Sequence, residues 1–136
     1  MTGGVLRIFI GYDEREAMAY HVLAHSLLRR ASRPLALVPL ARPLLRHLHQ
    51  RPRGLLDSTD FSITRFLVPA LCEYRGYAVF LDCDMLCQAD IGDILLYPLA
   101  DPGRAVYVCQ HDYTPKTATK FLGASQRSYQ IGRAHV

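Results

Sequence analysis

Two aspartates one residue apart, Asp82 and Asp84, are the residues whose types and spacing most directly suggest chemistry. They flank Cys83 directly after the apolar run Ala78–Leu81. In an extended chain, side chains two positions apart point to the same side, so both carboxylates can face one ligand. Hard oxygen ligands of this kind suit Mn²⁺ or Mg²⁺, and such an ion would bridge diphosphate oxygens. The triplet alone is a common pattern, so its place after an apolar strand carries much of this hypothesis.

Arg65, Tyr12 and Asp13 are further candidates for ligand binding. Arg65 lies among apolar helical positions but can point off their face toward the strand ends, where its planar guanidinium would hold a phosphate. The alternative is an ordinary surface or ion-paired arginine. Tyr12 can stack on a base, and Asp13 can accept hydrogen bonds from a base or a ribose. Alternatively, Asp13 is a helix cap and Tyr12 lies at the rim of the core.

Other polar residues indicate no defined role. His21 and His25 are four positions apart on a helix, which suits zinc, but the segment lacks the glutamate of a metalloprotease and we expect a structural role. The segment His111-Asp112-Tyr113 follows an expected strand and can face the same cleft. We expect Lys116 and Lys120 to be solvated.

The elements that must position these residues begin with a strand and a helix. Val5–Ile10 is a short apolar run that stops at Gly11, which predicts a buried strand ending in a turn. Asp13 then stands at a helix N-cap with Glu16 three residues later, the spacing of a capping box. Arg29-Arg30 closes the helix, where cations suit the C-terminal dipole.

The same alternation continues along the chain. The further expected elements are an outer strand at Leu35–Leu40 broken by Pro39, a helix with apolar positions from Ile63 to Tyr74 that Pro69 starts or kinks and Gly76 ends, the strand Ala78–Leu81, a short helix capped by Asp90, and a last strand at Ala105–Cys109. This order predicts an α/β fold with a mainly parallel sheet and helices on both faces. Ligands bind at the carboxyl ends of such strands, where both Gly11-Tyr12-Asp13 and the acidic triplet fall.

Composition limits the class of protein. The chain has 136 residues, enough for one domain, with 50% hydrophobic and 21% charged residues, which favours a packed core over disorder. It has no apolar run of the roughly 18 residues that a transmembrane helix needs and no recognisable signal peptide, so we expect a cytoplasmic protein. The four cysteines show no zinc-binding spacing, and we expect them to be reduced and structural.

The net charge of +4 comes largely from an arginine-rich stretch between Arg29 and Arg53. We interpret it as a solvated helix end and loop. The alternative is contact with an acidic surface such as anionic lipid, which would make the protein peripheral to a membrane. Nucleic acid is a weaker interpretation, because no Phe, Tyr or Trp lies in this stretch to stack on bases.

Three segments together resemble family 8 glycosyltransferases: Ile8-Phe9-Ile10-Gly11-Tyr12-Asp13, Ser62-Ile63-Thr64-Arg65-Phe66-Leu67-Val68-Pro69 and Phe80-Leu81-Asp82-Cys83-Asp84-Met85. Their order and separations also match, and the resemblance extends from Val5 to about Asp112. It implies a GT-A fold and retaining transfer of a sugar from a nucleotide donor, usually linked to UDP, to an acceptor that the sequence does not specify.

The resemblance also implies the roles of particular residues. Asp82 and Asp84 would bind Mn²⁺ and the donor, Arg65 would contact the sugar diphosphate, and Tyr12 and Asp13, together with Gly11, would hold the nucleoside. The third metal ligand of the family, a later histidine, has no counterpart here, and the strands that shape the acceptor site are absent. The resemblance thus covers a donor-binding portion that is incomplete at its C-terminus, and it assigns no catalytic residue.

The last residues suggest a sequencing artefact. Residues 131–136 can be encoded by ATC GGA AGA GCA CAC GTC, which matches a common sequencing adapter when the preceding codon ends in AG. We therefore expect residues 1–129 to be the native part of a single domain and residues 130–136 to be a non-native tail. Genomic DNA that encodes this tail before a natural stop codon would contradict the hypothesis.

Two other functions stay open. A haloacid-dehalogenase-type phosphatase also places two such aspartates after an apolar strand, but it favours Thr or Val where this chain has Leu86. A non-enzymatic module that binds nucleotides or anionic surfaces would use the arginine-rich stretch and no metal.

Overall fold

The computed structural model describes residues 4–55, 57, 59–110 and 116. Residue contacts divide the chain into two compact units, Met1–Gly92 and Asp93–Val136. The first unit holds three strands separated by helical segments, as the alternating apolar runs predict. The α/β class is therefore confirmed.

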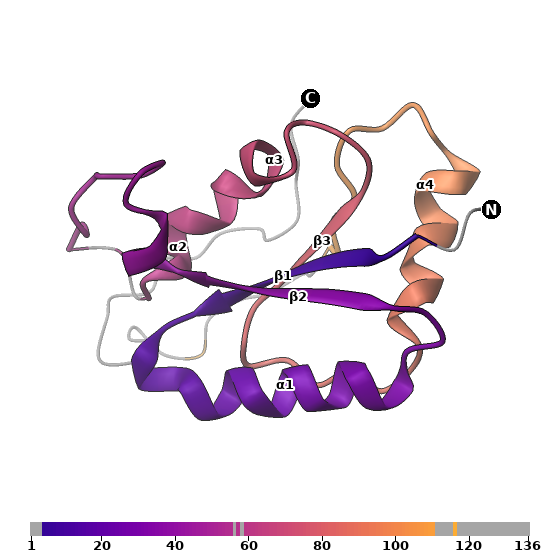
Figure 1. Cartoon of the computed structure of the whole chain (residues 1–136), viewed down its shortest axis with the longest axis horizontal. Coiled ribbons are helices and arrows are strands. Elements are labelled where there is room, and N and C mark those ends of the chain that lie inside the picture. Colours follow the sequence, from indigo (N-terminus) through magenta and orange to yellow (C-terminus); the bar gives the residue numbers. More distant parts are fainter. Residues whose placement is uncertain (1–3, 56, 58, 111–115, 117–136) are drawn as a thin grey trace. The chain divides into compact units, whose positions relative to one another are not determined.

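A parallel sheet of three strands forms the centre of the first unit (Figure 1). The central strand is β1 (Leu6–Tyr12), with β2 (Leu35–Ala41) on one side and β3 (Ala78–Leu81) on the other. The outer position predicted for the second strand is confirmed. Pro39 is tolerated there because an edge strand can lack one backbone donor.

The first strand runs past Gly11, which was expected to end it. Gly11 pairs with Leu40 and Tyr12 pairs with Ala41, so β2 extends the ladder by two residues. Glycine at this position allows the ring of Phe61 to pack against the strand, because a Cβ atom here would lie 2.5 Å from Cδ2 of Phe61. The predicted turn at Gly11 was therefore wrong: an aromatic ring occupies the space of its missing side chain.

One face of the sheet is covered by α1 (Ala17–Arg30), which follows a short 3-10 turn, η1 (Glu14–Glu16). Leu23 and Leu27 of the helix are fully buried. Ile8 and Ile10 of β1 are also fully buried, and the alternation of a strand places both on the α1 side. The helix ends at Arg30, as the paired arginines predict.

The other face carries a second layer of core and helix. Phe9, Leu40, Leu45 and Cys72 form a buried cluster against it. The helix predicted between Ile63 and Tyr74 is three short pieces and ends earlier: α2 (Phe61–Thr64), η3 (Arg65–Leu67) and α3 (Val68–Leu71). Pro69 lies in the first turn of α3, where a missing N–H costs no hydrogen bond. Gly76 follows in a turn with a φ of +70° that favours glycine.

The chain continues into η4 (Ile91–Leu95) and α4 (Leu96–Ala100). Asp90 Oδ1 accepts the backbone N–H of Gly92 at 2.9 Å, which confirms the predicted cap. Residues 105–109 are exposed and irregular, so the predicted last strand was wrong. Its continuous apolar run resembles a strand, but a strand also needs a partner, and these residues pair with none of the described strands.

Several expectations concern residues that the structure does not describe. His111-Asp112-Tyr113, Lys120 and the suspected tail at 130–136 lie outside the described residues, whereas Lys116 is exposed.

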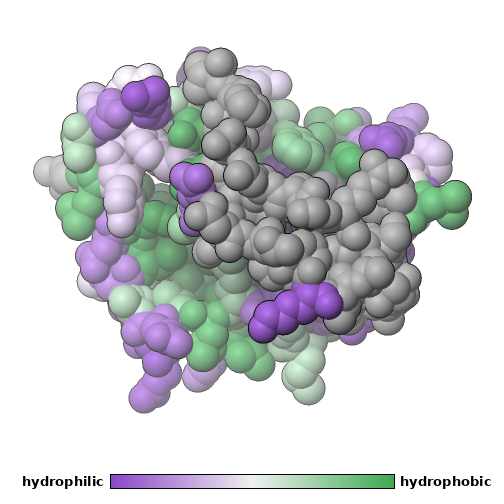
Figure 2. Space-filling view, turned by 180° about the vertical axis from the view of Figure 1, so that it is seen from behind, coloured by the Kyte–Doolittle hydropathy of each residue, from purple (hydrophilic) through white to green (hydrophobic). Residues whose placement is uncertain are grey.

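Among the described helices, none combines the length and the apolar character that crossing a membrane requires. Large apolar side chains such as Phe66 and Leu44 are exposed, and Figure 2 shows apolar patches beside polar residues on one face.

Candidate metal and diphosphate site

The predicted site residues lie at the carboxyl ends of β1 and β3, which are adjacent because the two strands are parallel. Ile10 pairs with Leu81, so the chain leaving β1 at Tyr12 runs beside the chain leaving β3 at Asp82. This is the placement that parallel pairing predicts for the acidic triplet and for Gly11-Tyr12-Asp13.

The alternation of β3 separates the members of the triplet. The side chain of Asp82 lies on the same face of the sheet as that of Phe80 and contacts Arg65, which follows α2. The side chain of Cys83 lies on the opposite face and contacts Glu16, directly before α1. Asp84 lies in a turn and is exposed, while Asp82 is partly buried. The negative charge of Asp84 nevertheless adds to the rise in the pKa of Asp82 that burial causes.

Arg65 is ion-paired with Asp82, as the alternative considered for it expects, and the pair lies at the end of β3. Its Nη2 lies 3.1 Å from Oδ1 of Asp82, and its guanidinium packs over two rings, 5.0 Å from the centroid of Phe80 and 5.7 Å from that of Phe61. Contacts of this kind hold the planar group in place. Arg65 is therefore preorganised at the edge where a diphosphate would bind.

Asp82 Oδ1 is an acceptor with an incomplete set of partners. The atom is buried, and although Arg65 is an ion-pair partner at 3.1 Å, their geometry is not that of a hydrogen bond. Burial raises the pKa of Asp82, Arg65 opposes this rise, and Asp84 adds to it. A buried carboxylate oxygen in this state has a free electron pair for a cation or a donor.

These observations fit Mn²⁺ or Mg²⁺, which bind carboxylate oxygens and keep several other ligands from water or substrate phosphates. Asp82 and Asp84 would supply the protein oxygens. Within residues 4–55, 57, 59–110 and 116, no group of three His, Cys, Asp or Glu residues is arranged to hold a metal ion. His21 and His25, in particular, belong to no such group, and the ring of His21 packs against Tyr20.

Glu16 and Cys83 form a contact that the sequence analysis missed. The Cys83 thiol donates to Glu16 Oε2 at 3.7 Å, so Glu16 is directed toward the triplet and the expected capping box is not completed. Burial, aided by the nearby negative charges of Glu16 and Asp84, raises the pKa of Cys83 to about 12 and keeps the thiol protonated. Burial, with Asp84 and Asp13, also raises the pKa of Glu16.

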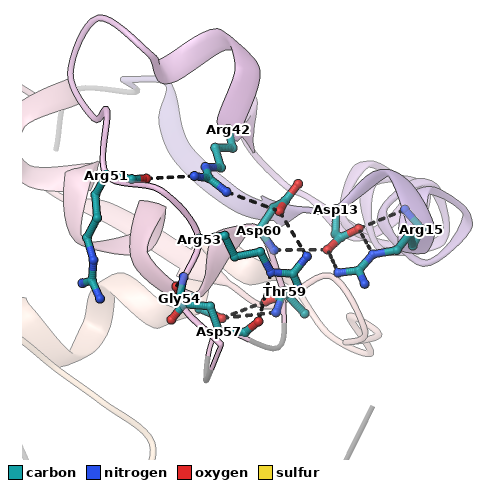
Figure 3. A network of polar contacts seen from close by, with 10 residues as sticks. Asp13, Arg15, Arg42, Arg51, Arg53, Gly54, Asp57, Thr59 and Asp60 are labelled. Atoms are coloured by element: carbon teal, nitrogen blue, oxygen red, sulfur yellow. Dashed lines mark hydrogen bonds and ion pairs between the residues drawn. The ribbon is translucent and has the colours of Figure 1, made fainter. Parts of the chain in front are cut away.

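Asp13 acts as a cap and a connector. Its side chain is 2% exposed and accepts hydrogen bonds from the backbone N–H of Arg15, from the Arg15 guanidinium and from the backbone N–H of Asp60 (Figure 3). The Arg15 guanidinium holds the pKa of Asp13 well below its usual range despite burial. Asp13 therefore ties the end of β1 to the segment before α2, and both of its oxygens are already engaged.

Tyr12 is the last residue of β1, and its ring packs against α1. It lies edge-on to Tyr20 of α1, with ring centroids 5.4 Å apart, and remains partly exposed. This geometry agrees with the rim position considered for Tyr12 and leaves part of the ring accessible for stacking.

Comparison with known proteins finds a relative in a plant. Over 125 residues the chain is 49% identical to Protein CDI of Arabidopsis thaliana; the match covers 90% of this chain and 48% of that protein. The chain therefore spans about half the length of this curated relative, whose name states no activity. No family model matches the chain, and no solved structure matches it.

Proposed function

We propose that this chain forms the donor-binding part of a metal-dependent glycosyltransferase that uses a nucleotide-linked sugar, with UDP as the nucleotide. The observation that carries the proposal is the pair formed by Asp82 and Arg65 at the carboxyl end of β3. A carboxylate for a metal and a guanidinium for a phosphate lie side by side there, which is what recognition of a metal-bound diphosphate requires.

Each residue has a distinct part in this proposal. Asp82 and Asp84 hold the divalent cation, which would neutralise charge on the leaving diphosphate when bound. Arg65, beside Asp82, would hold a phosphate oxygen and is kept in place by the rings of Phe61 and Phe80. Tyr12 offers a ring for the base. Asp13 fixes the loop beside the base through its bonds to Arg15 and Asp60.

A GT-A fold belongs to the same proposal. The parallel sheet, with a helix on each face and acidic residues at the carboxyl end of a strand, agrees with the donor-binding half of such a fold. The resemblance of the three segments around Tyr12, Arg65 and Asp82 supports it.

Calorimetry with UDP, in the presence and absence of Mn²⁺, tests the function. We expect binding only with the metal, and a loss of about tenfold or more in affinity for Asp82→Asn and for Asp84→Asn. Asp93→Asn is the matched control, because Asp93 is an exposed acid outside the site. Metal-independent binding that neither site substitution weakens would refute the proposal. Release of phosphate from a phosphomonoester, abolished by Asp82→Asn, would instead favour the phosphatase alternative.

A further inference from the structure

A basic pocket lies at the carboxyl end of β2, the outer strand on the opposite side of β1 from β3 and Asp82. Its volume is about 510 Å³, within the range of small-molecule sites. The lining includes Arg42, Arg46, His49, Gln50, Arg51 and Asp60. None of the residues proposed above for the metal or the diphosphate is among them.

The local fold fixes the pocket walls. Chain leaving β2 forms the 3-10 turn η2 (Arg42–Leu45), and the buried side chain of Leu45 anchors this turn in the core. The carbonyl of Leu45 accepts the backbone N–H of His49 at 2.9 Å, which closes the next turn. Arg42, at the start of this turn, and Arg46, directly after it, line the pocket.

The opposite wall is tied to the end of β1. Asp60 donates its backbone N–H to Asp13, and its carboxylate lies 4.0 Å from Arg42 and 3.7 Å from Arg53. Arg42 also donates to the carbonyl of Arg51 at 2.8 Å (Figure 3). Arg42 is therefore held at the pocket wall by two contacts.

Two other arginines, Arg46 and Arg51, also line the pocket. The guanidinium groups of Arg46 and Arg51 are exposed, and neither makes an ion pair with a described residue. Figure 3 shows the Arg51 side chain extending away from the polar network that holds Asp60. Three arginines and one aspartate thus line a single pocket, and this excess of positive charge favours a bound anion.

We propose that this pocket binds a compact ligand carrying more than one phosphate group, without a metal ion. Planar guanidinium groups bind phosphate oxygens in pairs, and two or more of them around one pocket favour a multiply charged ligand over a single carboxylate. Asp60 positions Arg42 and is not a contact for the anion. The ligand is either a free polyphosphorylated small molecule or the phosphorylated headgroup of a lipid.

The test compares two double variants that remove the same charge. Arg46→Gln with Arg51→Gln alters the pocket, and Arg29→Gln with Arg30→Gln alters the exposed end of α1. Binding of pyrophosphate and inositol trisphosphate is measured by calorimetry in EDTA, with citrate as a carboxylate of similar charge. A flotation assay uses phosphatidylcholine vesicles with phosphatidylinositol bisphosphate or with phosphatidylserine. Thermal melts verify folding, and Arg51→Gln alone replaces the pocket variant if the double variant melts early.

We expect the pocket variant to bind about tenfold more weakly than the unaltered chain, and the α1 variant to bind normally. Binding of the soluble probes identifies a free ligand. Binding only to vesicles that carry the bisphosphate identifies a lipid headgroup. Equal losses in both variants, citrate binding as tight as that of pyrophosphate, equal flotation with phosphatidylserine, or no binding of any probe would overturn the proposal. Because EDTA is present throughout, this result is independent of the metal-dependent UDP experiment.

Discussion

Gly11 provides the sharpest test of the structure, because a single added methyl group should disturb it. In Gly11→Ala, the new Cβ atom would lie 2.5 Å from Cδ2 and 2.6 Å from Cγ of Phe61. Overpacking of this kind costs about 1–3 kcal/mol, because the ring can relieve the clash only by moving. Alanine also reduces the entropy of the unfolded chain, which offsets about 0.4–1 kcal/mol. We therefore expect a net loss of about 1–2 kcal/mol in the free energy of unfolding.

Urea denaturation followed by circular dichroism measures this loss, and Gly103→Ala is the control. A Cβ atom at Gly103 would meet Asp101 Oδ1 at 3.6 Å, an ordinary contact, so its stability should change little. A Phe61→Leu background should make Gly11→Ala less costly, since the smaller side chain leaves space for the methyl group. If Gly11→Ala were as stable as the unaltered chain, or equally costly in both backgrounds, the packing explanation would be wrong.

Three further predictions concern Asp13, Arg65 and the cysteines. Asp13 has a lowered pKa in the fold, so its stabilising effect is fully present above its unfolded value of about 3.8 and is lost as the pH falls from there toward the folded value. Asp13→Ala should lose about 2 kcal/mol at pH 7 and show a flatter acid limb in melts that extend from pH 7 to about pH 2. Arg65→Gln should weaken UDP binding about tenfold with Mn²⁺ present, and Arg65→Lys should not restore it, because lysine lacks the planar fork; full restoration measured by calorimetry would contradict this reasoning. A thiol reagent at pH 8 should modify exposed Cys109 quickly and spare buried Cys83 until urea unfolds the chain, and mass spectrometry of the labelled peptides distinguishes the two.

The fold was predictable where local pattern and burial agree. Ala78–Leu81 is apolar and ends at polar Asp82, so both the strand and its end can be identified from the sequence. Residues 105–109 show an equally strand-like pattern but find no partner among the described strands, because pairing depends on distant chain that periodicity does not report. The extension of β1 through Tyr12 also depends on strand pairing, because Gly11 and Tyr12 pair with Leu40 and Ala41 of β2.

The candidate site was predictable in its positions and not in its contacts. Parallel strand order places Tyr12 and Asp82 at one edge, and this follows from sequence alone. The thiol contact between Cys83 and Glu16 joins residues far apart in the chain, and a capping box was the nearer explanation for Glu16. The burial of Asp82 Oδ1 depends on how the segment around Arg65 packs, which no local pattern specifies.

The central position of β1 has a consequence for how the chain reaches its fold during synthesis. The strand is synthesised before both of its partners, and Arg7 pairs with Ala36 on one side and with Ala78 on the other. Until Leu81 has been made, one edge of an apolar strand lacks its hydrogen-bonding partner and is open to pairing with other chains. Nascent chains that end before Ala78 should therefore depend on chaperones, and release from them should begin once β3 can join the sheet.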